Sequence, residues 1–126
     1  MRRGVADEAE RWPSEIRLAR DRAMLRLAFQ SGPPVELSAE YLRVKSPSAE
    51  VRGHGPGEGI TVSGKRNVRI ASIEPVGNYA IRIIFDDGHA TGIYSWSYLN
   101  ELARDERRIW NDYLEALAAR GLGRDV

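Results

Sequence analysis

Hydrophobic and polar residues alternate through the middle of the chain, and two turn signals interrupt the alternation. Three apolar runs between residues 68 and 95 are separated by Gly77-Asn78 and Asp87-Gly88. Such dipeptides supply the positive φ angles that two-residue hairpins require. One face of the middle run carries Tyr79, Ile81, Ile83 and Phe85. The pattern predicts a three-stranded antiparallel meander with one buried face.

Apolar residues at helical spacing follow the meander and predict two C-terminal helices. Ser95 or Ser97 can cap the first helix, because a short hydroxyl accepts from the free amides of the first turn. Its apolar positions are Leu99, Leu102 and Ala103. The second helix is amphipathic, with Trp110, Tyr113, Leu114, Leu117 and Ala118 on one face. Gly121 suits a left-handed terminus of that helix.

Alternation also occurs earlier in the chain and predicts a further hairpin. Residues 15–20 and 24–29 alternate on either side of Asp21-Arg22, and residues 35–37 read as a short edge strand.

The segment after this strand changes from helical to loop character. Ser38 is a suitable cap for one short helix over 39–45, which Pro47 ends. The glycine-rich stretch 46–65 reads as a loop, with a short strand expected at 60–62.

These elements predict a single α+β domain. Antiparallel hairpins and a meander pack against the C-terminal helices, and one short helix lies in the middle of the chain. We expect the domain to span residues 13–121, with a flexible lead-in at 1–12 and a C-terminal tail at 122–126.

Composition narrows the classes of function. The chain has no cysteine, which excludes disulfides, a catalytic thiol and any cysteine-held zinc or iron–sulfur site. Charged residues make up 29% of the 126 residues, yet the net charge is +1, so the balance does not indicate nucleic acid as a partner. No apolar run approaches the ~20 residues of a membrane span. We therefore expect neither nucleic-acid nor membrane binding, and a cytoplasmic location.

Polar side chains that can carry chemistry gather at the second predicted turn. Asp86, Asp87 and His89 lie there, and His54 lies in the glycine-rich loop. Two imidazoles with a carboxylate can hold a divalent metal if they converge. Alternatively, His89 makes a hydrogen bond to a backbone carbonyl or to Asp86, and Asp87 serves the turn itself.

Several aromatic residues follow the turn and have two interpretations. Tyr94, Trp96 and Trp110 either pack in the core between the sheet and the helices or form an exposed surface for a partner protein.

Several spaced motifs together resemble the gamma-butyrobetaine hydroxylase-like N-terminal domain family, in particular its short stand-alone bacterial members. The similarity covers roughly residues 13–120. The pieces that carry it are Glu40-Tyr41-Leu42-Arg43-Val44, Ser46-Pro47-Ser48-Ala49-Glu50-Val51, Gly53-His54-Gly55-Pro56-Gly57, Pro75-Val76-Gly77-Asn78-Tyr79, Phe85-Asp86-Asp87-Gly88-His89, Thr91-Gly92-Ile93-Tyr94-Ser95-Trp96 and Trp110-Asn111-Asp112-Tyr113-Leu114.

The resemblance implies a metal site that this sequence does not keep. In the hydroxylases the domain precedes an iron- and 2-oxoglutarate-dependent catalytic domain and holds zinc with three cysteines and one histidine. The histidine corresponds to His89 here, and the cysteines correspond to Ser46, Ser48 and Val51. Because neutral serine is a poor zinc ligand and valine is none, we expect the zinc site to be lost and no cofactor to be bound.

The resemblance also implies the functional setting. The family domain occurs fused to P-loop iron–sulfur carrier proteins as well as to oxygenases. Neither His54 nor His89 begins the His-x-Asp spacing of an oxygenase iron site. We therefore predict a non-catalytic accessory domain that docks a partner protein, linked to iron–sulfur or oxygenase machinery. The alternative is a metal or small-ligand site around His54, His89 and Asp86.

Overall fold

The first three strands form one antiparallel sheet. A computed structural model of the chain describes residues 12–52 and 59–126. The strands β1 (Glu15–Leu18), β2 (Met24–Ala28) and β3 (Val35–Ser38) lie in the order β1-β2-β3. Leu25 and Leu27 of β2 are buried on its inner face. The predicted first hairpin and edge strand are therefore confirmed.

A second sheet contains the predicted meander. Its strands β4 (Ile70–Val76), β5 (Ala80–Phe85) and β6 (Ile93–Ser95) lie in the order β4-β5-β6, each antiparallel to its neighbour. Gly77 and Gly88 have φ angles of +53° and +94°, which hairpin turns at these positions require. The meander, and with it the α+β fold class, is confirmed.

The predicted buried face of β5 is correct for three residues and wrong for one. Ile81, Ile83 and Phe85 are buried, whereas Tyr79 is 55% exposed. Tyr79 precedes the first residue of β5 and belongs to the turn, so the alternation of the strand does not extend to it. Ala80, on the opposite face, is also fully buried.

Helices follow both sheets. They are α2 (Ala39–Val44), α3 (Ala49–Arg52), α4 (Trp96–Arg104) and α5 (Glu106–Ala119). As predicted, the hydroxyls of Ser38 and Ser95 cap α2 and α4, accepting from the amides of Tyr41 and Tyr98 at 3.0 and 3.1 Å. Within the described ranges, none of the helices is long and apolar enough to cross a membrane.

The helix α3 corrects the prediction that residues 46–65 form only a loop and that the chain has one short middle helix. The Ser48 hydroxyl accepts from the amide of Glu50 at 3.2 Å, and the Ser48 carbonyl accepts from the amides of Val51 and Arg52. A single capped turn therefore forms directly after Pro47. It is too short to show helical periodicity in the sequence.

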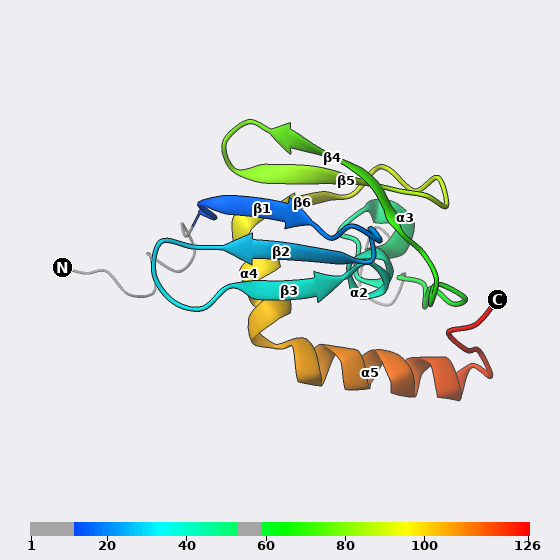
Figure 1. Cartoon of the computed structure of the whole chain (residues 1–126). Helices are drawn as coiled ribbons and strands as arrows, with labels where there is room; N and C mark the ends of the chain where they lie inside the picture. The colour runs from blue at the N-terminus through cyan, green and yellow to red at the C-terminus, as the bar shows by residue number, and fades with distance from the viewer. Residues whose placement is uncertain (1–11, 53–58) are drawn as a thin grey trace.

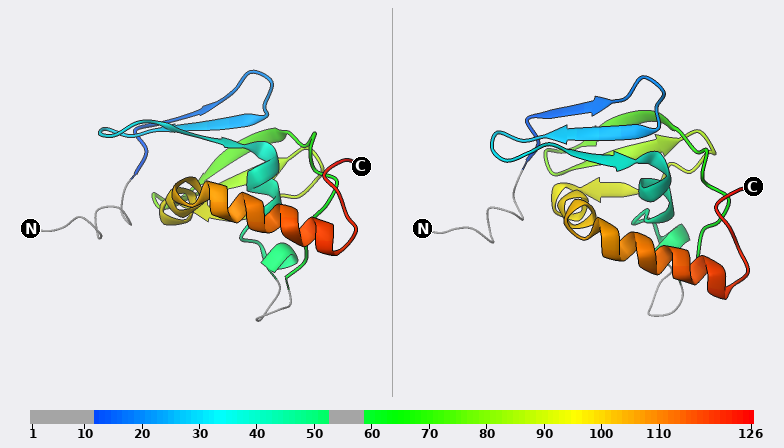
Figure 2. Two further views of the ribbon diagram at one scale, coloured as in Figure 1. Left: turned by 90° about the horizontal axis from the view of Figure 1, so that it is seen from below. Right: turned by 60° about the horizontal axis from the view of Figure 1, so that its bottom comes forward.

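The two sheets meet at the turn between β1 and β2. Arg22 has a φ of 64°; its carbonyl accepts from the amide of Ile70 at 2.9 Å, and its guanidinium donates to the carbonyl of Ala71 at 2.7 Å. This fastens the first hairpin to the start of β4. Figures 1 and 2 show the two sheets in different planes, with α5 crossing below them. One main core of buried residues from both sheets, α2 and α4 lies between the layers.

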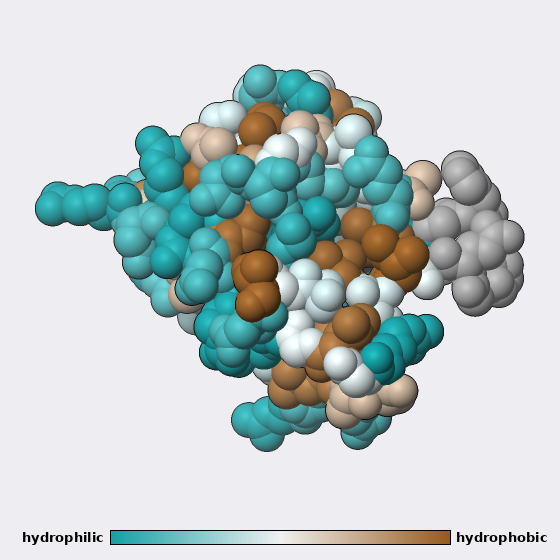
Figure 3. Space-filling model, turned by 90° about the vertical axis from the view of Figure 1, so that its right-hand side faces the viewer, coloured by the Kyte–Doolittle hydropathy of each residue, from teal (hydrophilic) through white to brown (hydrophobic). Residues whose placement is uncertain are grey.

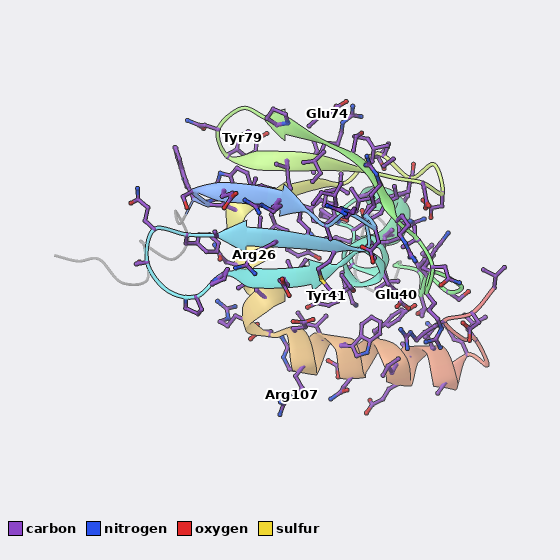
Figure 4. All side chains as sticks on the ribbon, in the orientation of Figure 1. Arg26, Glu40, Tyr41, Glu74, Tyr79 and Arg107 are labelled. Carbon is purple, nitrogen blue, oxygen red and sulfur yellow. The ribbon has the colours of Figure 1, made fainter. Side chains whose placement is uncertain are left out.

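Tyrosine hydroxyls connect the helices to the rest of the fold. Among the described residues, four donate to carbonyls of distant segments: Tyr41 to Leu102, Tyr94 to Leu42, Tyr98 to Lys45 and Tyr113 to Val62. Tyr41 of α2, labelled in Figure 4, thereby connects α2 to α4. The strand expected at 60–62 does not form. Instead, the Val62 carbonyl in this segment accepts a hydrogen bond from the Tyr113 hydroxyl at 2.6 Å.

The segment 122–126, predicted as a tail, is bound to the domain. The Arg124 guanidinium makes two hydrogen bonds to the carboxylate of Glu40, at 2.7 and 2.8 Å, and lies 5.2 Å from the ring centroid of Trp110. The amide of Arg66 donates to the Arg124 carbonyl at 3.0 Å. The last residues therefore contribute to the packing of α2 against α5.

Candidate functional site

The turn between β5 and β6 brings His89 to a pair of side chains from the α2–α3 segment. The Nε2 atom of His89 lies 2.8 Å from the Ser46 hydroxyl, and its Nδ1 atom lies 3.2 Å from the carboxylate of Glu50. The predicted partners of the His89 ring, a backbone carbonyl or Asp86, are therefore wrong, and its partners are Ser46 and Glu50. Both ring nitrogens are engaged within the fold.

Burial and charge keep this imidazole neutral. His89 is 7% exposed. Burial lowers the pKa of His89 below 6.5, and the Arg43 guanidinium adds to that effect, whereas the carboxylates of Glu50 and Asp87 oppose it. One nitrogen of the neutral ring donates and the other accepts, so Ser46 and Glu50 complement its two sides.

The two aspartates of the turn have structural partners. Asp86 accepts from the amide of Arg69 at 3.0 Å, and Asp87 accepts from the amide of His89 at 3.0 Å. Asp87 also pairs with Arg43 at 2.8 Å and Lys65 at 2.7 Å. Burial would raise the pKa of Asp87, but the bonds from Lys65, the His89 amide and Arg43 outweigh it and lower the pKa to about 2. The carboxylate is therefore ionised at neutral pH.

Two further hydroxyls lie next to His89 and Ser46. The Ser48 and Thr91 hydroxyls are 2.7 Å apart, and the amide of Ser48 donates to the Ser46 hydroxyl at 3.3 Å. Gly92 packs so closely that an added Cβ would strike the Ser46 hydroxyl. We call Ser46, Ser48, Glu50, His89 and Thr91 the serine–histidine cluster.

The order serine, histidine and carboxylate in this cluster matches that of a nucleophilic triad, but the environment of the serine does not. Ser46 has no exposed surface, and its oxygen already contacts both His89 and the amide of Ser48. A nucleophile must reach its substrate and needs donors for the oxyanion that forms. The cluster therefore cross-links the β5–β6 turn to the α2–α3 segment.

The donor set does not fit the zinc of the hydroxylase relatives. Of the positions that correspond to the cysteines, Ser46 is bonded to His89 and Ser48 to Thr91, while Val51 packs in a small apolar core. Neutral hydroxyls and a hydrocarbon do not supply thiolate ligands. No group of three or more histidines or carboxylates that could hold a metal occurs in residues 12–52 and 59–126. His54 lies outside these residues.

The aromatic candidates divide between core and surface. Tyr94 is fully buried, which corrects its assignment to a partner surface. Its ring is enclosed between β6 and α2, where burial raises the pKa of its hydroxyl. Trp96 and Trp110 are partly buried, and the Trp96 indole donates to the Asn78 carbonyl at 2.9 Å. For these two residues the surface role stays a prediction.

The concave sites on the described part of the chain include two that the sequence does not reveal. One, the sheet groove, has a volume of about 370 Å³ and is lined by Ile16, Leu18, Ile73, Pro75 and Ile81. The other, the helix pocket, has a volume of about 370 Å³ and lies between the α2–α3 segment, α4 and the start of α5. Both combine residues more than fifty positions apart, so neither leaves a local signal in the sequence.

Two small antiparallel sheets, packed against helices and joined to them at the hydrogen-bonded β5–β6 turn, define a compact α+β domain. The family model for "Gamma-butyrobetaine hydroxylase-like, N-terminal" matches residues 16–100. The chain belongs to this family, as the motifs predict.

Solved structures agree with this assignment. Two NMR solution structures are each 45% identical to this chain, with TM-scores of 0.78 and 0.77; they cover 91% and 90% of this chain and 90% and 85% of their own. A crystal structure of a protein of unknown function from the DUF971 family of Acidithiobacillus ferrooxidans ATCC 23270 is 35% identical, with a TM-score of 0.59, and the match covers 72% of this chain and 91% of that one. No curated protein matches.

Proposed function

We propose that this chain is a non-catalytic binding module that docks an extended segment of a partner protein in the sheet groove. The observation that supports this proposal is the position of the groove between two edge strands. β1 is one of the two edge strands of the first sheet and β4 one of the two edge strands of the second, and within the described part of the chain each pairs with one neighbour only. An edge strand can accept a further strand through its backbone groups.

The apolar lining repeats at the period of a strand. Ile16 and Leu18 on β1, and Ile73 and Pro75 on β4, are each two residues apart. Side chains of an extended segment also point to one side at every second residue. The groove therefore suits a segment with apolar residues at alternate positions.

The lining of the groove favours an uncharged occupant, because the residues that form it are all apolar. Charged residues of the same strands alternate with the lining residues and so point to the opposite face, where Arg17 pairs with Glu15 and Arg82 pairs with Glu74. A charged segment would gain little there, whereas an apolar segment would bury surface at about 25 cal/mol per Å².

Of the two edges, β1 is the better partner for the docked strand. β4 contains Pro75, which has no amide hydrogen, whereas β1 contains no proline. On the face drawn in Figure 3, apolar residues form separate areas divided by polar ones, as on an ordinary protein surface. That face gives no comparable reason for docking.

The expected partners follow from the family. Oxygenases and iron–sulfur carrier proteins are the classes to test first, and the proposal includes a cytoplasmic location shared with them.

Selection of peptides on the intact chain tests the proposal. We expect selected peptides to have two apolar residues separated by one position and few charges. By calorimetry, Leu18→Glu should weaken binding of a selected peptide at least tenfold, because a carboxylate would enter an apolar groove. Ile93→Glu, at an exposed apolar residue of β6, is the matched control and should leave affinity within about twofold.

A second measurement avoids changes to the protein. N-methylation of alternate peptide amides removes donors to an edge strand while leaving the side chains intact, and should also abolish binding. Unchanged affinity of the N-methylated peptide, or equal losses for the Leu18 and Ile93 variants, would contradict docking along β1.

A further inference from the structure

The helix pocket combines apolar walls with a concentration of positive charge. The apolar residues that line it are the exposed Ile60, the partly buried Ile109, and the buried Val44, Val51 and Leu102. Its ionisable lining consists of Lys45, Arg52, Arg108, Tyr98 and the single carboxylate Glu101. Three cations therefore face one acid around a volume of about 370 Å³.

Tyr98 holds two of these cationic residues in place. The guanidinium of Arg52 lies 4.7 Å from the centroid of its ring, and its hydroxyl donates to the carbonyl of Lys45 at 2.5 Å. Such a cation–π contact directs Arg52 across the pocket and limits the freedom that it would lose on binding a ligand.

Lys45 is already partly removed from water. Burial lowers the pKa of Lys45; the carboxylate of Asp112 opposes this effect, and Arg52 adds to it to a smaller extent. Arg108 is already paired, at 3.5 Å from Asp105 and 3.7 Å from Asp112, so Lys45 and Arg52 are the better candidates to pair with an anion. An anion in the pocket would therefore interact favourably with cations that are already partly desolvated.

We propose that the helix pocket binds a small organic carboxylate, whose head group pairs with Lys45 and Arg52 and whose apolar body packs against Ile60 and Ile109. The pocket volume is at the lower end of the range for small-molecule sites. This site is separate from the sheet groove and does not depend on partner docking.

The pocket is a binding site rather than a catalytic one. Ser46 contributes to its lining, yet the hydroxyl of Ser46 is buried against His89. No reaction step is assigned to it.

NMR titration of the labelled chain with sodium octanoate tests the proposal. We expect amide shifts at residues lining the helix pocket, and weaker ones with sodium phosphate, which lacks the apolar body, and with 1-octanol, which lacks the charge. Arg52→Gln, at an exposed position, should weaken octanoate binding about tenfold through loss of a charge-assisted hydrogen bond. Lys45→Met should weaken it comparably.

The control is Arg26→Gln, which removes the same charge from the outer face of β2, where Arg26 pairs with Glu36. Figure 4 labels Arg26 on the first sheet. The octanoate affinity of the Arg26→Gln variant should remain within twofold of the wild-type value. The assignment would be overturned if octanoate bound no more tightly than 1-octanol, or no more tightly than phosphate. It would also be overturned if the Arg52→Gln variant bound octanoate as tightly as the Arg26→Gln control.

Discussion

At the scale of single residues, hydrogen bonds hold the turn after β5 in place. His89, Ser46 and Glu50 satisfy one another in a region where an unpaired polar group would cost about 1–3 kcal/mol. The result is a cross-link between the second sheet and the α2–α3 segment. Its integrity depends on close packing around the Ser46 hydroxyl.

Gly92→Ala tests that packing. The added methyl would strike the Ser46 hydroxyl and come within 3.2 Å of the Tyr94 ring. We expect a loss of about 1–3 kcal/mol in the free energy of unfolding, measured in urea, as for other overpacked sites. Gly123→Ala, where a Cβ meets nothing within 4 Å, should change it by less than about 0.5 kcal/mol. Equal values for the two variants would show that Ser46 is not tightly enclosed.

The pKa of His89 predicts how stability depends on pH. Burial lowers this pKa below the ordinary value of 6.5, so the unfolded chain binds the proton more readily than the folded one. The contribution of His89 is fully present above about pH 6.5 and is lost as the pH falls through its folded pKa. Between pH 7.5 and pH 5.5, the free energy of unfolding measured in urea should fall more for the wild type than for His89→Gln. An equal loss in both proteins would contradict a neutral, buried imidazole.

At this scale the sequence predicts which residues gather, but not all of their contacts. The Asp86-to-His89 turn follows from Asp87-Gly88, because glycine at positive φ is a local requirement. The partners of His89 come from residues 46 and 50 and are fixed by tertiary packing. Only the motif resemblance, which aligned Ser46 with a metal-ligand position, pointed to that contact.

At the scale of elements, the C-terminal segment stabilises the packing of α2 against α5. Glu40 is buried, and Figure 4 shows it on the side of α2 that faces α5. Arg124 supplies its counter-charge from the end of the chain. A buried carboxylate depends strongly on such a partner.

Removal of this ion pair should therefore be costly. We expect Arg124→Met to lower the free energy of unfolding by about 2–4 kcal/mol, because it leaves Glu40 buried without its partner. Arg120→Met, at an exposed position, should change it by less than about 0.5 kcal/mol. Adding Glu40→Leu to Arg124→Met should restore part of the lost free energy of unfolding. Equal effects of the Arg124 and Arg120 substitutions, measured in urea, would show that the segment is not needed.

Elements with a strong period were predictable, and short ones were not. The strands and α4 follow from alternation, turn dipeptides and caps at Ser38 and Ser95. The helix α3 has one capped turn, which gives no period to detect. The expected strand at 60–62 has no partner strand because its carbonyl at Val62 binds Tyr113, a contact between segments fifty-one residues apart.

At the scale of the whole molecule, two hairpin-based sheets fastened at Arg22 leave the sheet groove between their edges, and the helices enclose the helix pocket elsewhere. Neither site is a property of one element. Alternation predicts the strands, but the angle between the two sheets decides that Ile16, Leu18 and Ile73 line an open groove. The proposed partner and the proposed carboxylate therefore bind at independent places.

Hydrogen exchange of the backbone amides tests the central claim, that β1 is an edge built to receive a partner strand. With a selected peptide bound, we predict slower exchange of β1 amides that face the groove and little change in α5. Protection confined to α5 or to the β5–β6 turn, with β1 exchanging as in the unbound chain, would contradict the account.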